Sequence, residues 1–170
     1  LDGSHSATAT FPQYAESGVW QLIGMLVDDK AGNLLNLSSS ELTSLGISAS
    51  VEIASVSDTT APVVTGVSVS PQVLDTSQSA QTIEVVYTAT DDISGVAHTI
   101  GYTDGLVFAS PSGAQKVKIN ASVFVLTSGT SLDGSHSATA TFPQYAESGV
   151  WQLIGMLVDD KAGNLLNLSS

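Results

Sequence analysis

An internal repeat without a single mismatch is the feature that most constrains this chain. Residues 1–39 recur as residues 132–170, so the two copies lie 131 residues apart. Self-similarity at a fixed spacing is typical of repeat architectures. Unrelated selection would not keep 39 consecutive positions identical. We therefore interpret the chain as a window from a tandem array that grew by recent duplication; an artificially duplicated segment would give the same pattern.

The repeat also suggests how the chain divides. Residues 40–57 complete the first copy, and the second copy is not followed by their equivalent. Segment 58–62 reads as a linker and strand start, because its proline holds the preceding residue extended. We predict that residues 1–57 are the C-terminal part of one repeat. Residues 58–170 are then the following repeat, which lacks its last strand.

Alternating apolar and polar residues predict β-strands along most of the chain. Such runs cover residues 63–69, 81–90, 117–125 and 138–142, and residues 149–158 are apolar on both faces. Turn-forming residues separate the runs, which favours an all-β fold built as an antiparallel β-sandwich. Only residues 39–46 read as a helix, with serine at the N-cap and Gly46 at the C-terminal end.

The composition excludes several classes of partner. Four Lys, no Arg and 16 acidic residues give a formal net charge of −12. Nucleic acids and anionic membrane surfaces are bound by clusters of basic residues, so we expect neither as a partner. The absence of Cys removes disulfides and thiolate metal sites. We see no transmembrane run and no leader like a signal peptide. Low Lys and abundant Ser and Thr favour an extracellular bacterial protein.

Two acidic loops are the strongest candidates for chemistry. One begins with Asp91 and Asp92, and the other begins with Asp159 and Asp160. Adjacent carboxylates repel one another unless they are solvated or bridged by a cation. Oxygen ligands from Asp, Asn and backbone carbonyls suit Ca²⁺. Because the same residues are also ordinary turn formers, the loops point to metal only if they meet in space.

Four segments together resemble the bacterial immunoglobulin-like and cadherin-like repeats of large adhesin-type surface proteins. Residues 147–153 and 159–164 contain Gly-x-aromatic and then Asp-x-x-Gly-Asn, as those repeats do; residues 90–96 resemble their B–C turn, and residues 58–62 their inter-repeat start. The resemblance implies an immunoglobulin-like sandwich in tandem repeats of period 131. That period exceeds the usual sandwich length of about 100 residues, so we expect an extra strand or long hairpin within 100–130.

The resemblance further implies a calcium site. Strand 81–90 would be strand B and strand 149–158 strand F, which places the B–C and F–G loops and the start of strand A at one pole. The D–E connection, 130–134, would point to the same pole. Carboxylates gathered there need a counter-ion, and Ca²⁺ between repeats would stiffen a stalk. The implied ligands are Asp58, Asp91, Asp92, Asp133, Asp159, Asp160 and Asn164, with Asp28, Asp29 and Asn33 in the first copy.

The remaining chemistry-bearing side chains are assigned structural roles. His5, His98 and His136 have no His or Cys partners at metal-ligand spacing. Trp151 and Tyr145 are expected as core anchors, with the Tyr145 hydroxyl donating to the backbone as in a tyrosine corner. The sequence offers no legible nucleophile–base pair, so we predict that the chain is not an enzyme.

These observations favour a calcium-rigidified spacer repeat in an extracellular bacterial surface or adhesion protein, with neighbouring repeats as its partners. The alternatives are a module that binds carbohydrate or a host partner, and an ancillary domain of a secreted enzyme. Residues 1–57 lack the first half of their own repeat. We therefore predict that they pack through strand exchange or edge pairing with a second molecule, as a homo-oligomer.

Overall fold

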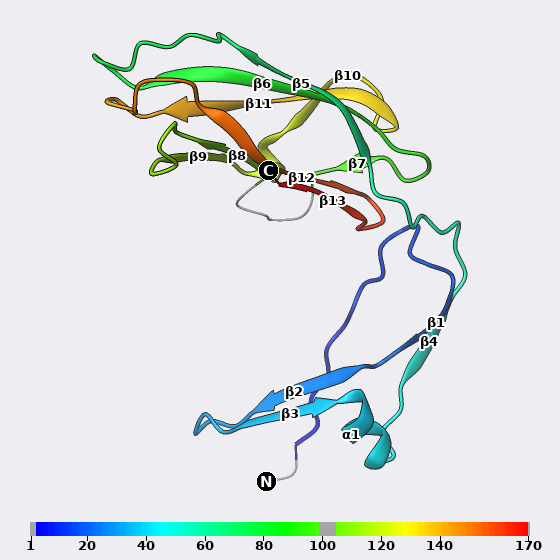
Figure 1. Ribbon diagram of the computed structural model, residues 1–170. Helices are drawn as coiled ribbons and strands as arrows, with labels where there is room; N and C mark the ends of the chain where they lie inside the picture. The colour runs from blue at the N-terminus through cyan, green and yellow to red at the C-terminus, as the bar shows by residue number, and fades with distance from the viewer. Residues whose placement is uncertain (1–2, 99–104, 170) are drawn as a thin grey trace. The chain divides into compact units, whose positions relative to one another are not determined.

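The computed structural model describes residues 3–98 and 105–169, and it consists mostly of antiparallel strands (Figure 1). The all-β prediction is confirmed. The chain divides into a smaller unit, residues 15–57, and a larger unit, residues 1–14 with 58–170. The break predicted at 57/58 is one border between the units, but residues 1–14 group with the larger one. Nowhere in the two described stretches does a helix reach the length and apolarity needed to cross a membrane.

The larger unit contains two sheets. The first has the order β10-β11-β6-β5. Its strands are β5 (Val63–Ser70), β6 (Gln81–Thr90), β10 (Val125–Gly129) and β11 (Asp133–Phe142). The second has the order β13-β12-β8-β9, and β7 also pairs with β12. Its strands are β7 (Val96–Ala97), β8 (Leu106–Ala109), β9 (Lys116–Ile119), β12 (Gln152–Asp160) and β13 (Leu165–Ser169). As predicted for a run that is apolar on both faces, β12 is a central strand.

Both sheets contribute to one hydrophobic core, so the larger unit is a β-sandwich. Every second residue of β6 is buried, as the period-2 pattern requires. Residues from the opposite sheet, including Phe108 of β8 and Met156 of β12, belong to the same core cluster. Burying each large apolar side chain stabilises the fold by about 1.5–3 kcal/mol.

The run 117–125, predicted as one strand, is two strands in different sheets. β9 ends at Ile119, a 3-10 turn follows over Ala121–Val123, and β10 begins at Val125. The Asn120 side chain accepts hydrogen bonds from the backbone N–H of Ser122, at 2.9 Å, and from its hydroxyl. Asn120 thus caps the turn and breaks the strand, although the apolar alternation continues across it. The extra strand or long hairpin expected within 100–130 falls partly on residues 99–104, which lie outside the described ranges.

The smaller unit contains two antiparallel strand pairs and a short helix. β1 (Gly18–Gln21) pairs with β4 (Ser50–Ile53), and β2 (Gly24–Asp28) pairs with β3 (Leu34–Ser38). The helix α1 (Ser39–Ser44) begins where predicted, with Ser38 and Glu41 forming a capping box.

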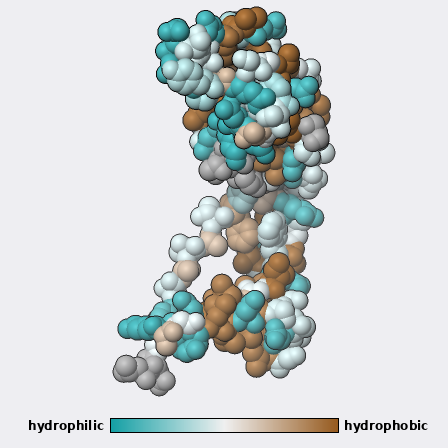
Figure 2. Space-filling model, turned by 60° about the vertical axis from the view of Figure 1, so that its left-hand side comes forward, coloured by the Kyte–Doolittle hydropathy of each residue, from teal (hydrophilic) through white to brown (hydrophobic). Residues whose placement is uncertain are grey.

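The smaller unit buries little of its own apolar surface. Across its fully described length, the only buried apolar side chains are Ala15 and Leu42. Every residue of β2 is exposed. Brown apolar residues accordingly gather on the surface there (Figure 2).

Candidate metal centre

Three carboxylates converge at one end of the sandwich. Asp58 precedes β5, while Asp91 and Asp92 follow β6. Because β5 begins opposite the residue where β6 ends, Val63 against Thr90, the flanking residues meet at the same edge. One carboxylate oxygen from each of the three lies within 4.8 Å of the others. Three of the predicted ligands are thus brought together by the segment before β5 and the loop after β6.

Asp58 anchors this group from a buried position, with only 3% of its surface exposed. Its Oδ2 accepts a hydrogen bond from the Ser94 N–H at 2.9 Å, and its Oδ1 accepts from the Thr60 N–H at 3.1 Å. Burial by itself would raise the pKa of Asp58, but the hydrogen bonds from Ser94 and Thr60 outweigh it and hold the pKa below its usual value. Asp58 therefore stays ionised.

Only one of the two oxygens of the Asp91 carboxylate accepts hydrogen bonds. Its Oδ1 accepts from the backbone N–H groups of Gly95 and Ile93, while its Oδ2 is buried and has no hydrogen-bond partner. Asp92, which is exposed, accepts from the Thr60 hydroxyl at 2.7 Å. Thr60 thus ties the segment before β5 to the loop after β6. Sequence reasoning missed Thr60 and Ser94; the only signal for Thr60 is its place two residues after Asp58, where an Asx-turn bond forms.

The second acidic loop contacts Asp58 through Asn164 and contacts the first acidic loop through Lys161. Its side-chain amide donates to Asp160 Oδ2 at 2.7 Å and to the Asp58 carbonyl at 3.1 Å. The Lys161 N–H also donates to the Gly95 carbonyl at 3.0 Å. The loops 91–95 and 160–164 therefore lie against each other.

Three other predicted ligands, Asp133, Asp159 and Asp160, are not part of the three-carboxylate group. Asp159 and Asp160 are adjacent on a strand, so their side chains point to opposite faces rather than crowding one another. Both are buried, and the Asp159 charge is, after burial of the hydroxyl itself, the second cause that raises the pKa of Tyr87. Asp133 is exposed in β11 and is not among the grouped carboxylates.

The first-copy residues form the same turn without the surrounding carboxylates. Asp29 Oδ1 accepts from the N–H groups of Ala31 and Asn33, and the Asn33 amide donates to Asp29 Oδ2 at 2.7 Å. These bonds, with the Asn33 side chain contributing most, lower the pKa of Asp29. Asp28 is exposed. In the described ranges, the only group of three such residues is the one around Asp58.

Two histidines lie side by side in the sandwich, with His136 buried and His98 half-buried. His136 is stacked on Tyr87 with ring centroids 4.9 Å apart, and its Nδ1 lies 2.9 Å from His98 Nε2. Burial, and secondly the neighbouring His136, lower the pKa of His98 to about 4; burial also lowers the pKa of His136. Both rings are therefore neutral at pH 7. We interpret the pair as part of the packing of the sandwich rather than as a charged site.

The expected tyrosine corner is absent. Tyr145 is 75% exposed and adopts a left-handed backbone, with φ of 64°. Its side chain therefore turns away from the core. Trp151 does act as an anchor: its ring meets Phe142 edge-on at 5.0 Å, and its Nε1 donates to the Glu147 carbonyl.

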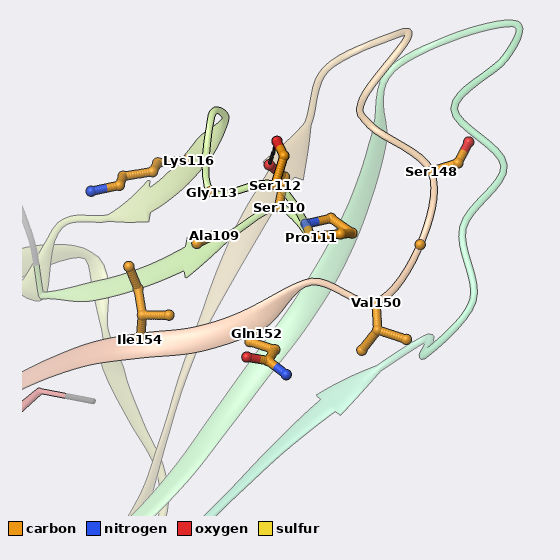
Figure 3. A pocket seen from close by; sticks show the side chains of 11 residues that line it. Ala109, Ser110, Pro111, Ser112, Gly113, Lys116, Ser148, Val150, Gln152 and Ile154 are labelled. Atoms are coloured by element: carbon orange, nitrogen blue, oxygen red, sulfur yellow. Dashed lines mark hydrogen bonds between the residues drawn. The ribbon is translucent and has the colours of Figure 1, made fainter.

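Two hollows of about 700 Å³ each lie at the opposite end of the sandwich, where β11 finishes at Phe142. The hollow in Figure 3 runs between the turn after β8 and residues 148–154, and Lys116 is its one charged lining residue. The other includes Tyr145 and Trp151 in its lining. Neither holds a group of convergent titratable side chains comparable to the acidic end.

No protein-family model, curated protein or solved structure matches this chain. The functional argument therefore proceeds from the geometry of the acidic end.

Proposed function

We propose that the chain is a calcium-rigidified structural spacer repeat of an extracellular bacterial surface or adhesion protein, and not an enzyme. The observation that carries this proposal is the group formed by Asp58, Asp91 and Asp92, with oxygens within 4.8 Å of one another. Ca²⁺ binds oxygens at about 2.3–2.6 Å, so two oxygens on one ion lie up to about 5 Å apart. The spacing of the three carboxylates fits one such ion.

The partnerless Asp91 Oδ2 supports a cation at this place. A buried carboxylate oxygen without a hydrogen bond costs free energy that a bound cation would offset. Three carboxylates held this close also repel one another, and a divalent ion relieves that repulsion. Because Ca²⁺ takes six to eight oxygens, backbone carbonyls and water would supply the rest.

Asn164 and Asp160 act as positioning residues in this proposal. The Asn164 nitrogen faces Asp58, and an amide nitrogen donates hydrogen bonds rather than binding a cation. Asp160 in turn accepts a hydrogen bond from the Asn164 amide and so fixes its orientation. The second loop therefore orients Asp58 for the ion, while the ligands come from Asp58 and the loop after β6.

The strand order supports the immunoglobulin-like assignment. With β5 as strand A and β6 as strand B, one sheet reads A-B-E-D and the other reads C′-C-F-G, formed by β9, β8, β12 and β13. This is the order of immunoglobulin-type sandwiches with one added strand. In that fold the acidic end is the pole at which the chain begins strand A.

A spacer role follows from where the ion would act. Asp58 is the first residue after the smaller unit, and Thr60 follows it by two residues. An ion bound by Asp58 and the loop after β6 would fix the segment through which one repeat continues into the next. Neighbouring repeats are then the partners, and Ca²⁺ lowers the freedom of the linker.

Calcium-dependent stability tests the proposal. Calorimetric titration and thermal unfolding with 1 mM Ca²⁺ or with chelator should show one bound ion and a higher Tm, because a ligand at 100 times its Kd stabilises by about 2.7 kcal/mol. Asp91→Asn together with Asp92→Asn should remove both effects. Asp75→Asn, which changes an exposed carboxylate that caps Ser77, is the control and should retain them. Identical melting curves with Ca²⁺ and chelator would reject the site.

The second candidate function is a carbohydrate-binding module, and the exposed Tyr145 beside a hollow favours it. Sugars stack on exposed aromatic rings, and Tyr145 borders a hollow of about 700 Å³. Tyr145→Ala should then abolish binding on a glycan array, while Tyr14→Ala, in the identical first-copy context, should preserve it. Equal binding by both variants and the parent chain would argue against this role.

A further inference from the structure

The main chain of Asp58, the buried anchor of the three-carboxylate group, is held by a residue far away in the sequence. We infer that Tyr14 is a positioning residue for the calcium site. Its left-handed backbone directs its carbonyl at the Asp58 N–H, and this bond keeps Asp58 where an ion needs it. The role rests on the proposed function and extends it to a residue outside both acidic loops.

Both main-chain polar groups of Asp58 have partners. The Asp58 N–H donates to the Tyr14 carbonyl at 3.0 Å. The Asp58 carbonyl accepts from the Asn164 side-chain amide at 3.1 Å. Because Asp58 is only 3% exposed, water is not a ready substitute for either partner. Tyr14 and Asn164 therefore fix the Asp58 main chain from its two sides.

Tyr14 makes this bond from an uncommon backbone conformation, with φ of 70°. Few residues other than glycine adopt positive φ, and β-branched residues almost never do. The identical Tyr145 has φ of 64°, so the shared sequence Phe-Pro-Gln-Tyr, residues 11–14 and 142–145, produces the same turn twice. In the first copy, the carbonyl at the end of that turn accepts from Asp58.

The first-copy turn is better covered than the second. Tyr14 is half-buried, whereas Tyr145 is 75% exposed. The next carbonyl along, that of Ala15, accepts a hydrogen bond from the Ser55 hydroxyl. Two successive carbonyls, at Tyr14 and Ala15, therefore bond the stretch of chain that ends at Asp58. The turn at Tyr14 is thus engaged with this stretch and is not a free surface loop.

Holding Asp58 in place before the ion arrives raises calcium affinity. The ion needs Asp58, Asp91 and Asp92 together, as the structure has them, with oxygens within 4.8 Å of one another. When the binding conformation is only partly populated, the apparent Kd rises by the inverse of its population. Without the Tyr14 carbonyl, the buried Asp58 N–H needs another acceptor, and other conformations of this segment then compete with the one that binds calcium.

Calorimetric titration of the full chain with Ca²⁺ tests the role of Tyr14. Tyr14→Val should raise the Kd about tenfold, because a β-branched residue disfavours the left-handed backbone. Tyr14→Gly removes the same ring but adopts that backbone freely, so its Kd should stay within about twofold of the parent value. Tyr145→Val is the matched control: it makes the same change in the same turn at the opposite end of the sandwich, and should leave the Kd unchanged.

Amide hydrogen exchange in chelator provides a second readout that needs no metal. The Asp58 N–H should exchange about tenfold faster in Tyr14→Val than in the parent chain or in Tyr14→Gly. A parent-like Kd in Tyr14→Val would overturn the role of Tyr14, as would equal weakening by Tyr14→Gly or by Tyr145→Val. A parent chain that binds no Ca²⁺ at all would reject the proposed function itself, and is therefore distinguishable from those results.

Discussion

The same 39 residues occur twice in this chain and differ in structure between the two copies. Comparing the copies separates local from long-range determinants of structure. In both copies, the Tyr at position 14 or 145 has a left-handed φ, 70° or 64°. The Trp Nε1 donates to the carbonyl four residues earlier in each, at 2.9 Å. These features survive in a copy that lacks the opposing sheet, so the local sequence is sufficient for them.

Strand β11, unlike these turns, forms in only one of the two copies. Residues 133–142 form a strand because β6 lies beside them, and the identical residues 2–11 form none over the positions described, 3–11. A strand's backbone groups need a neighbouring strand, whereas a turn satisfies its own. The turns and the β2–β3 hairpin therefore form from the local sequence alone. Strand β11 forms only where β6 lies beside it.

The largest expected difference between the two copies is the loss of stability when the matched methionines, Met156 and Met25, are changed to Ala. Met156→Ala leaves a cavity in the core and should lower the free energy of unfolding by about 2–4 kcal/mol. Met25→Ala changes an exposed side chain and should lower it by less than about 0.5 kcal/mol. Urea denaturation of both variants measures the difference. Equal losses would mean that the first copy is as buried in solution as the second.

Acid should distinguish the histidines of the two copies. The pKa of His98 falls from 6.5 to about 4 on folding, and that of His136 is also lowered. Protons therefore bind the unfolded chain more readily, so this stability is present above pH 6.5 and is lost as the pH falls towards 4. Allowing for the partial exposure of His98, we expect a loss of about 1–3 kcal/mol.

Denaturant unfolding between pH 7 and pH 4 measures this loss. His136→Phe should flatten the pH dependence by removing one buried ring and relieving the other. His5→Phe, at the identical but exposed position, should leave it unchanged. A slope that persists in His136→Phe would assign the acid sensitivity to carboxylates instead.

The smallest expected effect concerns the two Asp-Asn turns. Asn164 bonds Asp160 and also the Asp58 carbonyl, while Asn33 bonds only Asp29 among the hydrogen bonds described for its amide. Asn164→Ala should cost about 1–2 kcal/mol of stability, measured in chelator. Asn33→Ala should cost less than about 0.5 kcal/mol. Similar costs would show that the Asp58 contact adds nothing.

Much of the sandwich could be predicted because its signals are local. The alternation over 81–90 predicts β6, and the capping serine and Gly46 predict α1 within one or two residues. The break at Asn120 could not be predicted, since apolar residues keep their alternation across it. A side-chain cap that redirects a strand into the other sheet depends on tertiary contacts that periodicity does not contain.

The acidic end shows the same division. The meeting of the 58–62, 91–95 and 160–164 segments follows from strand order, which the resemblance supplied. The placement of each carboxylate did not follow: Asp159 is buried, Asp133 is exposed, and neither is among the grouped oxygens. The use of these residues as calcium ligands stays a prediction.

The distance along the chain between β6 and its partner matters during synthesis. β6 ends at Thr90, and β11, which pairs with it over ten residues, begins at Asp133. At about 5–20 residues per second, the ribosome needs roughly 2–9 s to add the 42 residues between them. Throughout that interval one edge of β6 has unpaired backbone N–H and C=O groups, which are open to any strand of matching pattern. Vectorial synthesis thus leaves the first sheet with an open edge until residues 133–142 have emerged.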